Sequence, residues 1–199
     1  MKSFPFIIGI LLGAMLVSIP WYYAWKSEVD EANANFFEAI IEEPEISNLI
    51  LEETQIKLTE SDLNWSFTDV DGKEYLLDDL TNKVVFMNFW ATWCVPCIAE
   101  FPSLNDLYKK YKDNDQIVFL FLSYESSGKV KRFMKEKAEF NLPFYNFELK
   151  SKPNLFSSSG IPTTIIINTK GEMVLKHTGM AHWDSDNVMK LLNDLLIEK

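Results

Sequence analysis

The sequence has 199 residues, of which 47% are hydrophobic and 24% are charged, a composition typical of one folded domain with an appendage. The net charge is −10 and the only arginine is Arg132, so the chain offers no basic stripe for nucleic acid, which we exclude as a partner. Two cysteines are too few for the framework of a disulfide-rich scaffold. The fold must therefore rest on a hydrophobic core, which leaves the cysteine pair free for chemistry.

The N-terminal residues 4–25, FPFIIGILLGAMLVSIPWYYAW, contain no charged side chain, and as a helix they would reach about 33 Å, enough to span a hydrocarbon core. Residues 21–25 hold two tryptophans and two tyrosines, which favour the membrane interface. Lys2 precedes the run and acidic residues follow it, so residues 26–199 are predicted to lie outside the cytoplasm. We predict an uncleaved anchor within residues 1–25. A cleaved signal peptide is the disfavoured alternative, because the run ends in Pro20 and bulky aromatics.

Residues 26–61 are predicted to be an acidic extracytoplasmic linker. Residues 26–60 contain ten acidic residues against two lysines, so most of the negative charge lies here. Apolar residues recur at helical spacing from Val29 to Ile40, and Pro44 should end that helix. The segment is either a solvated spacer or a helix that docks a partner. The following stretch, ISNLILEETQIKL, is ambiguous between helix and strand.

Residues 62–199 are predicted to form the globular domain. The segment WSFTDVDGKEYLL indicates a hairpin that turns at Asp71 and Gly72, and KVVFMNFW indicates a strand buried on both faces. A helix with one buried stripe follows, beginning at or just before Cys94. Pro102 lies inside it and predicts a kink. The stripe consists of Ile98, Phe101, Leu104, Leu107, Tyr108 and Tyr111.

The second half of the domain continues the alternation of strands and helices. QIVFLFLS indicates a second buried strand, joined to the first by a right-handed parallel crossover, and KVKRFMKEKAEF indicates a helix. TTIIIN and EMVLKHT are predicted to form an antiparallel hairpin around TKG, followed by an amphipathic helix from about Asp184 to Ile197. The predicted fold class is α/β, with a mixed β-sheet flanked by helices.

The spacing of the two cysteines favours redox chemistry. Cys94 is expected at a helix N-terminus, where amide donors stabilise a thiolate, and Cys97 lies one turn further on, within reach of a mixed disulfide on Cys94. Pro96 is tolerated in the first helical turn. A structural disulfide would close a very short loop and stabilise the fold little. A zinc site with His177 and His182 is disfavoured, because 79 residues separate the two pairs and a buried strand precedes the cysteines.

These residues carry a resemblance to a known family. NFWATWCVPCIAEFP resembles the active-site segment of thioredoxin-fold oxidoreductases, in particular the membrane-anchored TlpA/ResA-like group with its W-C-x-P-C-x-x-E-x-P pattern. DVDGKEYLLDDLTNKVVFMNFW resembles the first hairpin and core strand of that group, and SGIPTTIIINTKGEMV its second active-site loop and hairpin. The likeness covers about residues 62–198. It implies a thioredoxin-like three-layer sandwich.

The resemblance also implies a substrate-binding surface. Pro162 is expected to follow a cis peptide bond and to lie against the cysteines, where the backbone of Ile161 and Pro162 would pair with an extended substrate strand. Trp93, Val95 and Pro96 are the other predicted substrate-binding residues. An edge-strand proline is the alternative for Pro162. Trp90 is expected to fill the core instead.

One position departs from classical thioredoxin, which has a buried aspartate where this chain has Asn88. Glu100 matches the glutamate of the TlpA/ResA-like group and is the predicted substitute. If Glu100 is buried, desolvation would raise its pKa, and it could exchange a proton with Cys97. The alternative is a first-turn glutamate that serves only the helix dipole.

The resemblance implies a thiol-disulfide oxidoreductase of the bacterial cytoplasmic membrane, with its catalytic domain in the extracytoplasmic or periplasmic space. Cys94 would attack, Cys97 would resolve, and no metal or organic cofactor would be needed. The predicted partners are a disulfide-containing client protein, a membrane thiol protein that donates electrons, and the lipid bilayer through residues 4–25. The absence of histidine between the cysteines favours a reductase, and the resemblance indicates cytochrome c maturation as its pathway. A disulfide-forming oxidase or isomerase, or a nonenzymatic binding module, is the alternative.

Overall fold

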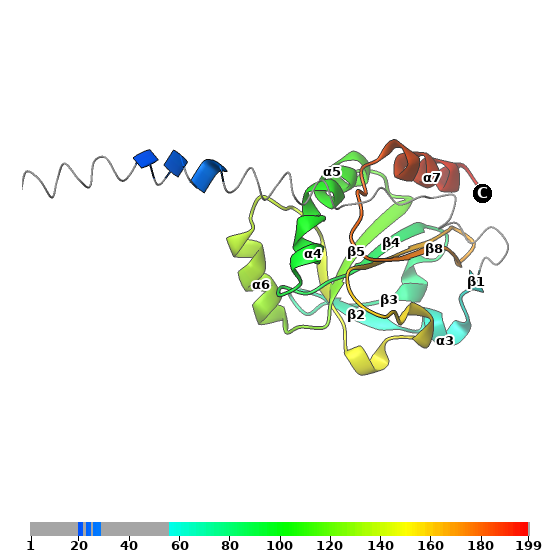
Figure 1. Cartoon of the computed structure of the whole chain (residues 1–199). Coiled ribbons are helices and arrows are strands. Elements are labelled where there is room, and N and C mark those ends of the chain that lie inside the picture. Colours follow the sequence, from blue (N-terminus) through cyan, green and yellow to red (C-terminus); the bar gives the residue numbers. More distant parts are fainter. Residues whose placement is uncertain (1–19, 22, 25, 29–55, 199) are drawn as a thin grey trace, which may run out of the picture. The chain divides into compact units, whose positions relative to one another are not determined.

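The computed structural model describes residues 20–21, 23–24, 26–28 and 56–198 (Figure 1). The chain divides into two units between residues 41 and 42, and the described residues of the first unit are helical. Across the described ranges, no helix has the length and apolar character needed to cross a bilayer. Most of the predicted anchor and linker lies outside these ranges, so both stay predictions.

An eight-stranded mixed sheet forms the centre of the second unit (Figure 1). Its strand order is β1-β8-β7-β4-β5-β6-β2-β3. The pairs β4–β5 and β5–β6 are parallel, and all other neighbours are antiparallel. The strands are β1 (Ile56–Lys57), β2 (Ser66–Asp69), β3 (Glu74–Leu76), β4 (Val84–Phe89), β5 (Ile117–Ser123), β6 (Phe144–Asn146), β7 (Thr163–Ile167) and β8 (Glu172–Thr178).

Strand β4 lies at the middle of the sheet and leads to the cysteines. All six of its residues are buried, because β5 and β7 pair with it and both of its faces are covered. The parallel β4–β5 pairing confirms that the predicted connection between these strands is a parallel crossover. In the antiparallel β4–β7 register, Asn88 lies opposite Thr164, which brings the loop before β7 next to the segment that holds the cysteines. Both predicted hairpins are also present.

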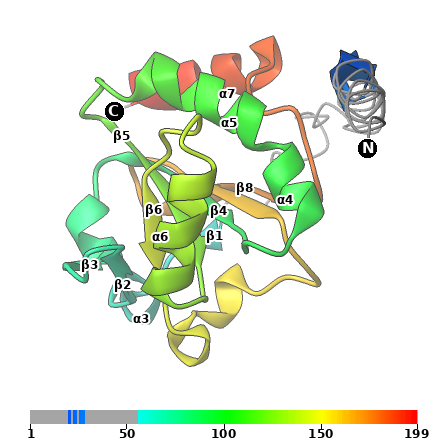
Figure 2. The ribbon, with the colours of Figure 1, turned by 90° about the vertical axis from the view of Figure 1, so that its left-hand side faces the viewer.

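Four α-helices pack on one face of the sheet (Figure 2). The opposite face is covered by α3 and by 3₁₀ turns. The α-helices are thus not shared equally between the two faces. The helices are α3 (Glu60–Leu63), α4 (Val95–Ala99), α5 (Phe101–Tyr111), α6 (Ser127–Glu136) and α7 (Asp186–Ile197), and the 3₁₀ turns are η1 (Leu77–Leu80), η2 (Leu149–Ser151) and η3 (Asn154–Phe156).

Two boundaries differ from the sequence prediction. The helix expected to kink at Pro102 is divided into α4 and α5, which meet at Glu100, because Pro102 lies in the first turn of α5, where its missing N–H leaves no bond unmade. The domain also begins before residue 62, the boundary drawn from the sequence. Ile56 pairs with Met173 of β8, and Leu58 is buried. A two-residue strand is too short to show a periodic pattern.

Candidate active site

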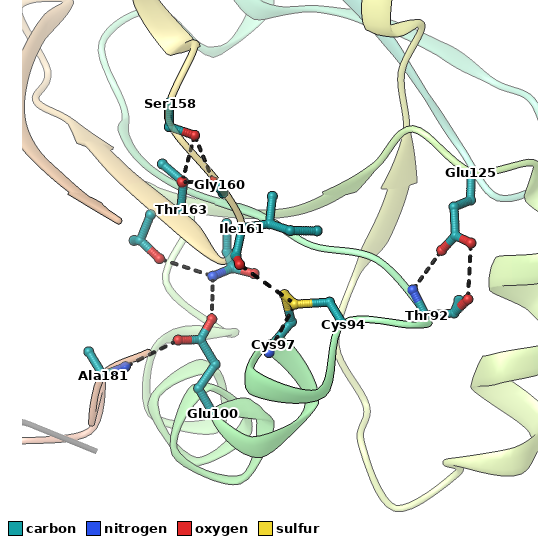
Figure 3. The surroundings of a disulfide bond; sticks show 12 residues. Thr92, Cys94, Cys97, Glu100, Glu125, Ser158, Gly160, Ile161, Thr163 and Ala181 are labelled. Carbon is teal, nitrogen blue, oxygen red and sulfur yellow. Dashed lines mark hydrogen bonds between the residues drawn. A yellow bond between two sulfur atoms is a disulfide. The ribbon is translucent and has the colours of Figure 1, made fainter. Parts of the chain in front are cut away.

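The two cysteines form a disulfide at the N-terminal end of α4 (Figure 3). Cys94 is the N-cap residue, and its Sγ accepts a hydrogen bond of 3.3 Å from the backbone N–H of Cys97. Cys97 is fully buried, whereas Cys94 retains 3% of its exposure. In the reduced protein the same amide would stabilise a thiolate on Cys94. Cys94 is therefore the more accessible of the two cysteines.

The loop before β7 lies against the disulfide. The Ile161–Pro162 peptide bond is cis, as expected, and the carbonyl oxygen of Ile161 lies 3.8 Å from Cys94 Sγ (Figure 3). The Thr163 hydroxyl donates a 2.7 Å hydrogen bond to the Gly160 carbonyl. The Pro162 carbonyl accepts a 3.0 Å hydrogen bond from Gly179. These bonds hold the loop in place beside Cys94 Sγ.

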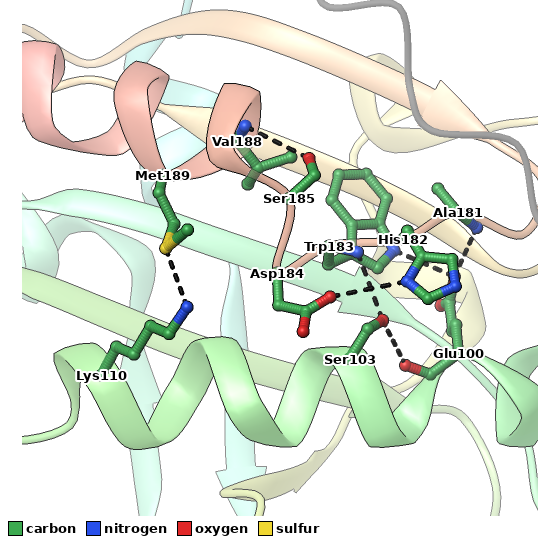
Figure 4. A network of polar contacts seen from close by, with 10 residues as sticks. All are labelled: Glu100, Ser103, Lys110, Ala181, His182, Trp183, Asp184, Ser185, Val188 and Met189. Carbon is green, nitrogen blue, oxygen red and sulfur yellow. Dashed lines mark hydrogen bonds and ion pairs between the residues drawn. The ribbon is translucent and has the colours of Figure 1, made fainter.

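Glu100 points into the core, where it accepts three hydrogen bonds (Figures 3 and 4). Its Oε1 accepts from Asn88 Nδ2 at 2.8 Å, and its Oε2 accepts from Trp183 Nε1 at 3.0 Å and from the Ala181 amide at 3.3 Å. Burial raises the pKa of Glu100 to about 8, and the hydrogen bonds from Trp183, Asn88 and Ala181 oppose that rise. The Glu100 carboxyl is buried and hydrogen-bonded to distant residues. The alternative interpretation, an exposed first-turn glutamate that interacts only with the helix dipole, therefore does not fit the structure.

The polar groups around Glu100 can accommodate both of its protonation states. Asn88 Nδ2 also donates to Thr164 Oγ1 at 3.0 Å, while Asn88 Oδ1 has no partner among the described residues. A half-turn of the Asn88 amide would present Oδ1 to a protonated Glu100 and to the Thr164 hydroxyl, which can each donate. No hydrogen bond joins Glu100 to either sulfur within the described part of the chain.

The predicted rim residues flank the disulfide and remain open to solvent. Trp93 and Val95 are each 60% exposed, and Pro96 is exposed as well. Trp90 is 1% exposed and packs against Phe101 at a ring-centroid distance of 5.1 Å, which confirms its place in the core. The substrate-binding roles of the rim residues stay predictions, but their exposure is compatible with contact to a client.

Sequence reasoning missed Glu125. Its buried carboxylate accepts hydrogen bonds from the Thr92 amide at 2.6 Å and from the Thr92 hydroxyl at 3.0 Å (Figure 3). Thr92 follows β4 and Glu125 follows β5, and the carboxyl ends of adjacent parallel strands lie at one edge of a sheet. An acidic residue directly after a buried strand was therefore the available signal. This contact fixes the segment that leads into Cys94.

The two histidines do not join the cysteines. His177 packs edge-on against the ring of Trp183 at 5.7 Å, and burial lowers its pKa. His182 Nδ1 lies 3.5 Å from a carboxylate oxygen of Asp184 (Figure 4). In the described ranges, no three side chains of histidine, cysteine, aspartate or glutamate gather as metal ligands would.

Comparison with known proteins gives consistent relatives. The family model described as Redoxin matches residues 57–192. Thiol-disulfide oxidoreductase ResA of Halalkalibacterium halodurans is 31% identical over 133 residues, which cover 67% of this chain and 75% of that protein. ResA of Bacillus subtilis is 36% identical over 116 residues, which cover 58% of this chain and 64% of that protein. The chain thus matches about two thirds of the length of these curated relatives.

Solved structures show the same architecture. A thiol:disulfide interchange protein of the thioredoxin family from Chlorobium tepidum is 25% identical, with a TM-score of 0.56, covering 66% of this chain and 92% of that one. An exposed lipoprotein thioredoxin from Streptococcus pneumoniae is 26% identical, also with a TM-score of 0.56, covering 65% of this chain and 98% of that one. The domain has a thioredoxin-like α/β fold. The chain belongs to the Redoxin family, within its TlpA/ResA-like group of thiol-disulfide oxidoreductases.

Proposed function

We infer that this chain reduces disulfide bonds in client proteins outside the cytoplasm and is held at the bacterial cytoplasmic membrane by residues 4–25. The observation that carries the redox assignment is the disulfide itself. It joins a nearly buried Cys94 to a fully buried Cys97 beside the cis peptide bond before Pro162. The anchor rests on the uncharged N-terminal run and the charges that flank it.

The reaction begins with the reduced dithiol. The Cys94 thiolate attacks one sulfur of the client disulfide, which forms a Cys94–client disulfide and releases the other client sulfur as a thiolate. The Cys97 thiolate then attacks Cys94 Sγ, so the Cys94–Cys97 disulfide forms and the second client thiolate leaves. Two electrons pass from the dithiol to the client. The two protons of the dithiol end on the two client thiols.

Glu100 takes part in the transfer of one of these protons, that of Cys97. With a pKa raised to about 8 by burial, it is protonated in about nine molecules of ten at pH 7, yet it can ionise at modest cost. It lies three residues after Cys97, at the junction of α4 and α5. In the reduced protein the ionised form, about one molecule in ten at pH 7, accepts the proton of the Cys97 thiol as that thiol becomes the attacking thiolate.

The direction of the reaction follows from the residues between the cysteines. Val95 and Pro96 carry no charge and donate no side-chain hydrogen bond, so nothing in the intervening dipeptide stabilises the thiolate as a histidine would. A less stable thiolate makes the dithiol a better reductant. A membrane thiol protein must then recharge it, and cytochrome c maturation is the reductive pathway that we propose.

The reduction potential of the Cys94–Cys97 pair tests this proposal. Equilibration of the full chain with thiol buffers should give a value near or below about −240 mV, as for thioredoxin-like reductants. A value of about −150 mV or higher would identify an oxidase instead. Cys97→Ser should trap clients on Cys94 as adducts that a reductant releases, and Cys94→Ser should trap none. Absence of a reducible adduct in Cys97→Ser would contradict the assigned division of roles.

A further inference from the structure

A pocket of about 200 Å³ opens beside the disulfide. Trp93 and Ile161 line it, and both also border Cys94. Trp93 precedes Cys94 in the chain, and the Ile161 carbonyl oxygen lies 3.8 Å from Cys94 Sγ (Figure 3). Glu100 does not line this pocket. A side chain that occupied it would therefore belong to a segment passing the reactive sulfur.

The floor of the pocket is aromatic and tightly packed. Phe89 and Phe147 line it, are both buried, and meet edge-on at 5.5 Å. The rings of Phe89 and Phe147 also pack against Trp65, at ring-centroid distances of 6.2 Å and 5.6 Å. This close packing keeps the two rings from moving into the pocket and filling it. An apolar cavity of about 150 Å³ is large enough for benzene. The pocket can thus hold one large apolar side chain.

The rim of the pocket exposes apolar surface. Trp93 is 60% exposed, Leu149 is 58% exposed and Tyr124 is 40% exposed, and all three line the pocket. Val95, also 60% exposed, follows Cys94. Exposed apolar side chains gathered around one concavity typically mark a binding surface. Here they surround the entrance to the active site.

One cation lies within this apolar surface. Lys152 lines the pocket with its Nζ 5.0 Å from the centre of the Phe89 ring, and it makes no ion pair with any described residue. Partial burial lowers the pKa of Lys152, as does the nearby Lys176. Lys176, by contrast, donates to the backbone carbonyls of Leu155 and Ser157, at 2.9 Å and 2.6 Å. Lys152 is therefore a partly desolvated cation that an anion would stabilise.

We propose that this pocket, lined by Trp93, Lys152 and Ile161, selects clients in which a large apolar residue and an acidic residue lie next to the disulfide cysteine. The apolar side chain fills the aromatic floor, and the carboxylate pairs with Lys152. This inference rests on the proposed reductase function and specifies the sequence class of its clients.

The net charge of the chain helps to distinguish a specific contact with Lys152 from a general electrostatic attraction of the peptide. With a net charge of −10, the chain as a whole repels acidic peptides and attracts basic ones. A preference for an acidic peptide must therefore come from a local positive group. Raising the salt concentration screens the long-range repulsion more strongly than a contact in a partly buried pocket.

The test compares two peptides as substrates of the reduced full chain in detergent. Each peptide has one cysteine blocked as a mixed disulfide with thionitrobenzoate, a coloured leaving group, next to Phe-Glu in one peptide and Phe-Lys in the other. The Phe-Glu peptide should react about five times faster, as expected for one favourable charge contact. Lys152→Met should lower the Phe-Glu to Phe-Lys rate ratio to one or less, and Lys152→Arg should leave the ratio unchanged. Lys150→Met, which removes an exposed lysine outside the pocket lining, is the matched control and should keep it as well.

The outcomes separate the two proposals. A Phe-Glu to Phe-Lys rate ratio of one or less in the parent chain, or an unchanged ratio in Lys152→Met, would overturn the pocket assignment. Replacing the peptide phenylalanine with alanine should slow the reaction about fivefold, because apolar burial is lost, and equal rates would also count against the assignment. If the parent chain reduces neither peptide nor hydroxyethyl disulfide, the reductase function itself is refuted.

Discussion

Replacing Glu100 with glutamine should change how the stability of the oxidised protein depends on pH. The carboxyl of Glu100 has a pKa of about 8 in the folded chain, against 4.5 without the effects of folding. Between these values the folded state binds a proton that the unfolded state has released, so the free energy of unfolding falls as pH rises. The contribution of Glu100 to the free energy of unfolding is fully present below pH 4.5 and is lost as the pH rises from there through about 8.

The magnitude follows from the difference between the two pKa values. About 3.5 units at about 1.4 kcal/mol per unit give an upper bound of about 5 kcal/mol, of which about 3.5 kcal/mol falls between pH 5 and pH 8. Glutamine cannot ionise, so the free energy of unfolding of Glu100→Gln should not fall in this way as pH rises. Its amide also fits the site, because it can accept from Trp183 and donate to Asn88 Oδ1, the atom that otherwise lacks a described partner.

Urea titrations of the oxidised parent and of Glu100→Gln, followed by tryptophan fluorescence at several pH values, measure this effect. The quantity of interest is the difference in unfolding free energy between the two proteins, because groups common to both, such as His177, cancel. That difference should move in favour of the variant by up to about 3.5 kcal/mol from pH 5 to pH 8. A constant difference over that range would refute the raised pKa, and with it the proposed role of Glu100 in proton transfer.

Two further predictions concern contacts around the site. Glu125→Ala should lower the free energy of unfolding by about 1–3 kcal/mol in urea titrations, because the Thr92 amide loses its acceptor. Lys129→Ala removes only an exposed partner of Glu125 and should cost less than about 1 kcal/mol; equal losses in both variants would contradict this account. Trp183→Phe should raise the pKa of Glu100 further, because the indole N–H stabilises the carboxylate. Infrared titration of the carboxyl band measures that pKa, and an unchanged value would exclude the effect.

The long elements of the fold could be predicted because their signals are local. Strands β4 and β5 are nearly continuous apolar runs, β7 consists of threonine and isoleucine alone, and Gly72 and Gly171 adopt the positive φ that their hairpin turns require. Strands β1 and β6 have two and three residues, too few for a period to show. Their places depend on partners far along the chain.

The same distinction applies to the candidate site. The spacing of Cys94 and Cys97 is local and points directly to paired thiols. The surroundings of Glu100 are not local, because Trp183, which donates to its carboxylate, is 83 residues away in the chain. Lys152, which makes no ion pair with any described residue, likewise directly follows a 3₁₀ turn whose sequence shows no motif. Such features arise only when distant segments pack together.

The hydrogen bond between Asn88 and Glu100 also limits which residues these two positions can hold together. A chain with aspartate in place of Asn88 and glutamate kept at position 100 would place two carboxyl groups within hydrogen-bonding distance of each other. Both carboxyl groups could not ionise at that distance. One carboxyl and one amide satisfy the hydrogen bonds of the site, whichever of the two positions carries each group. Relatives should therefore have an acidic residue at the position of Asn88 or at the position of Glu100, and acidic residues at both positions should be rare.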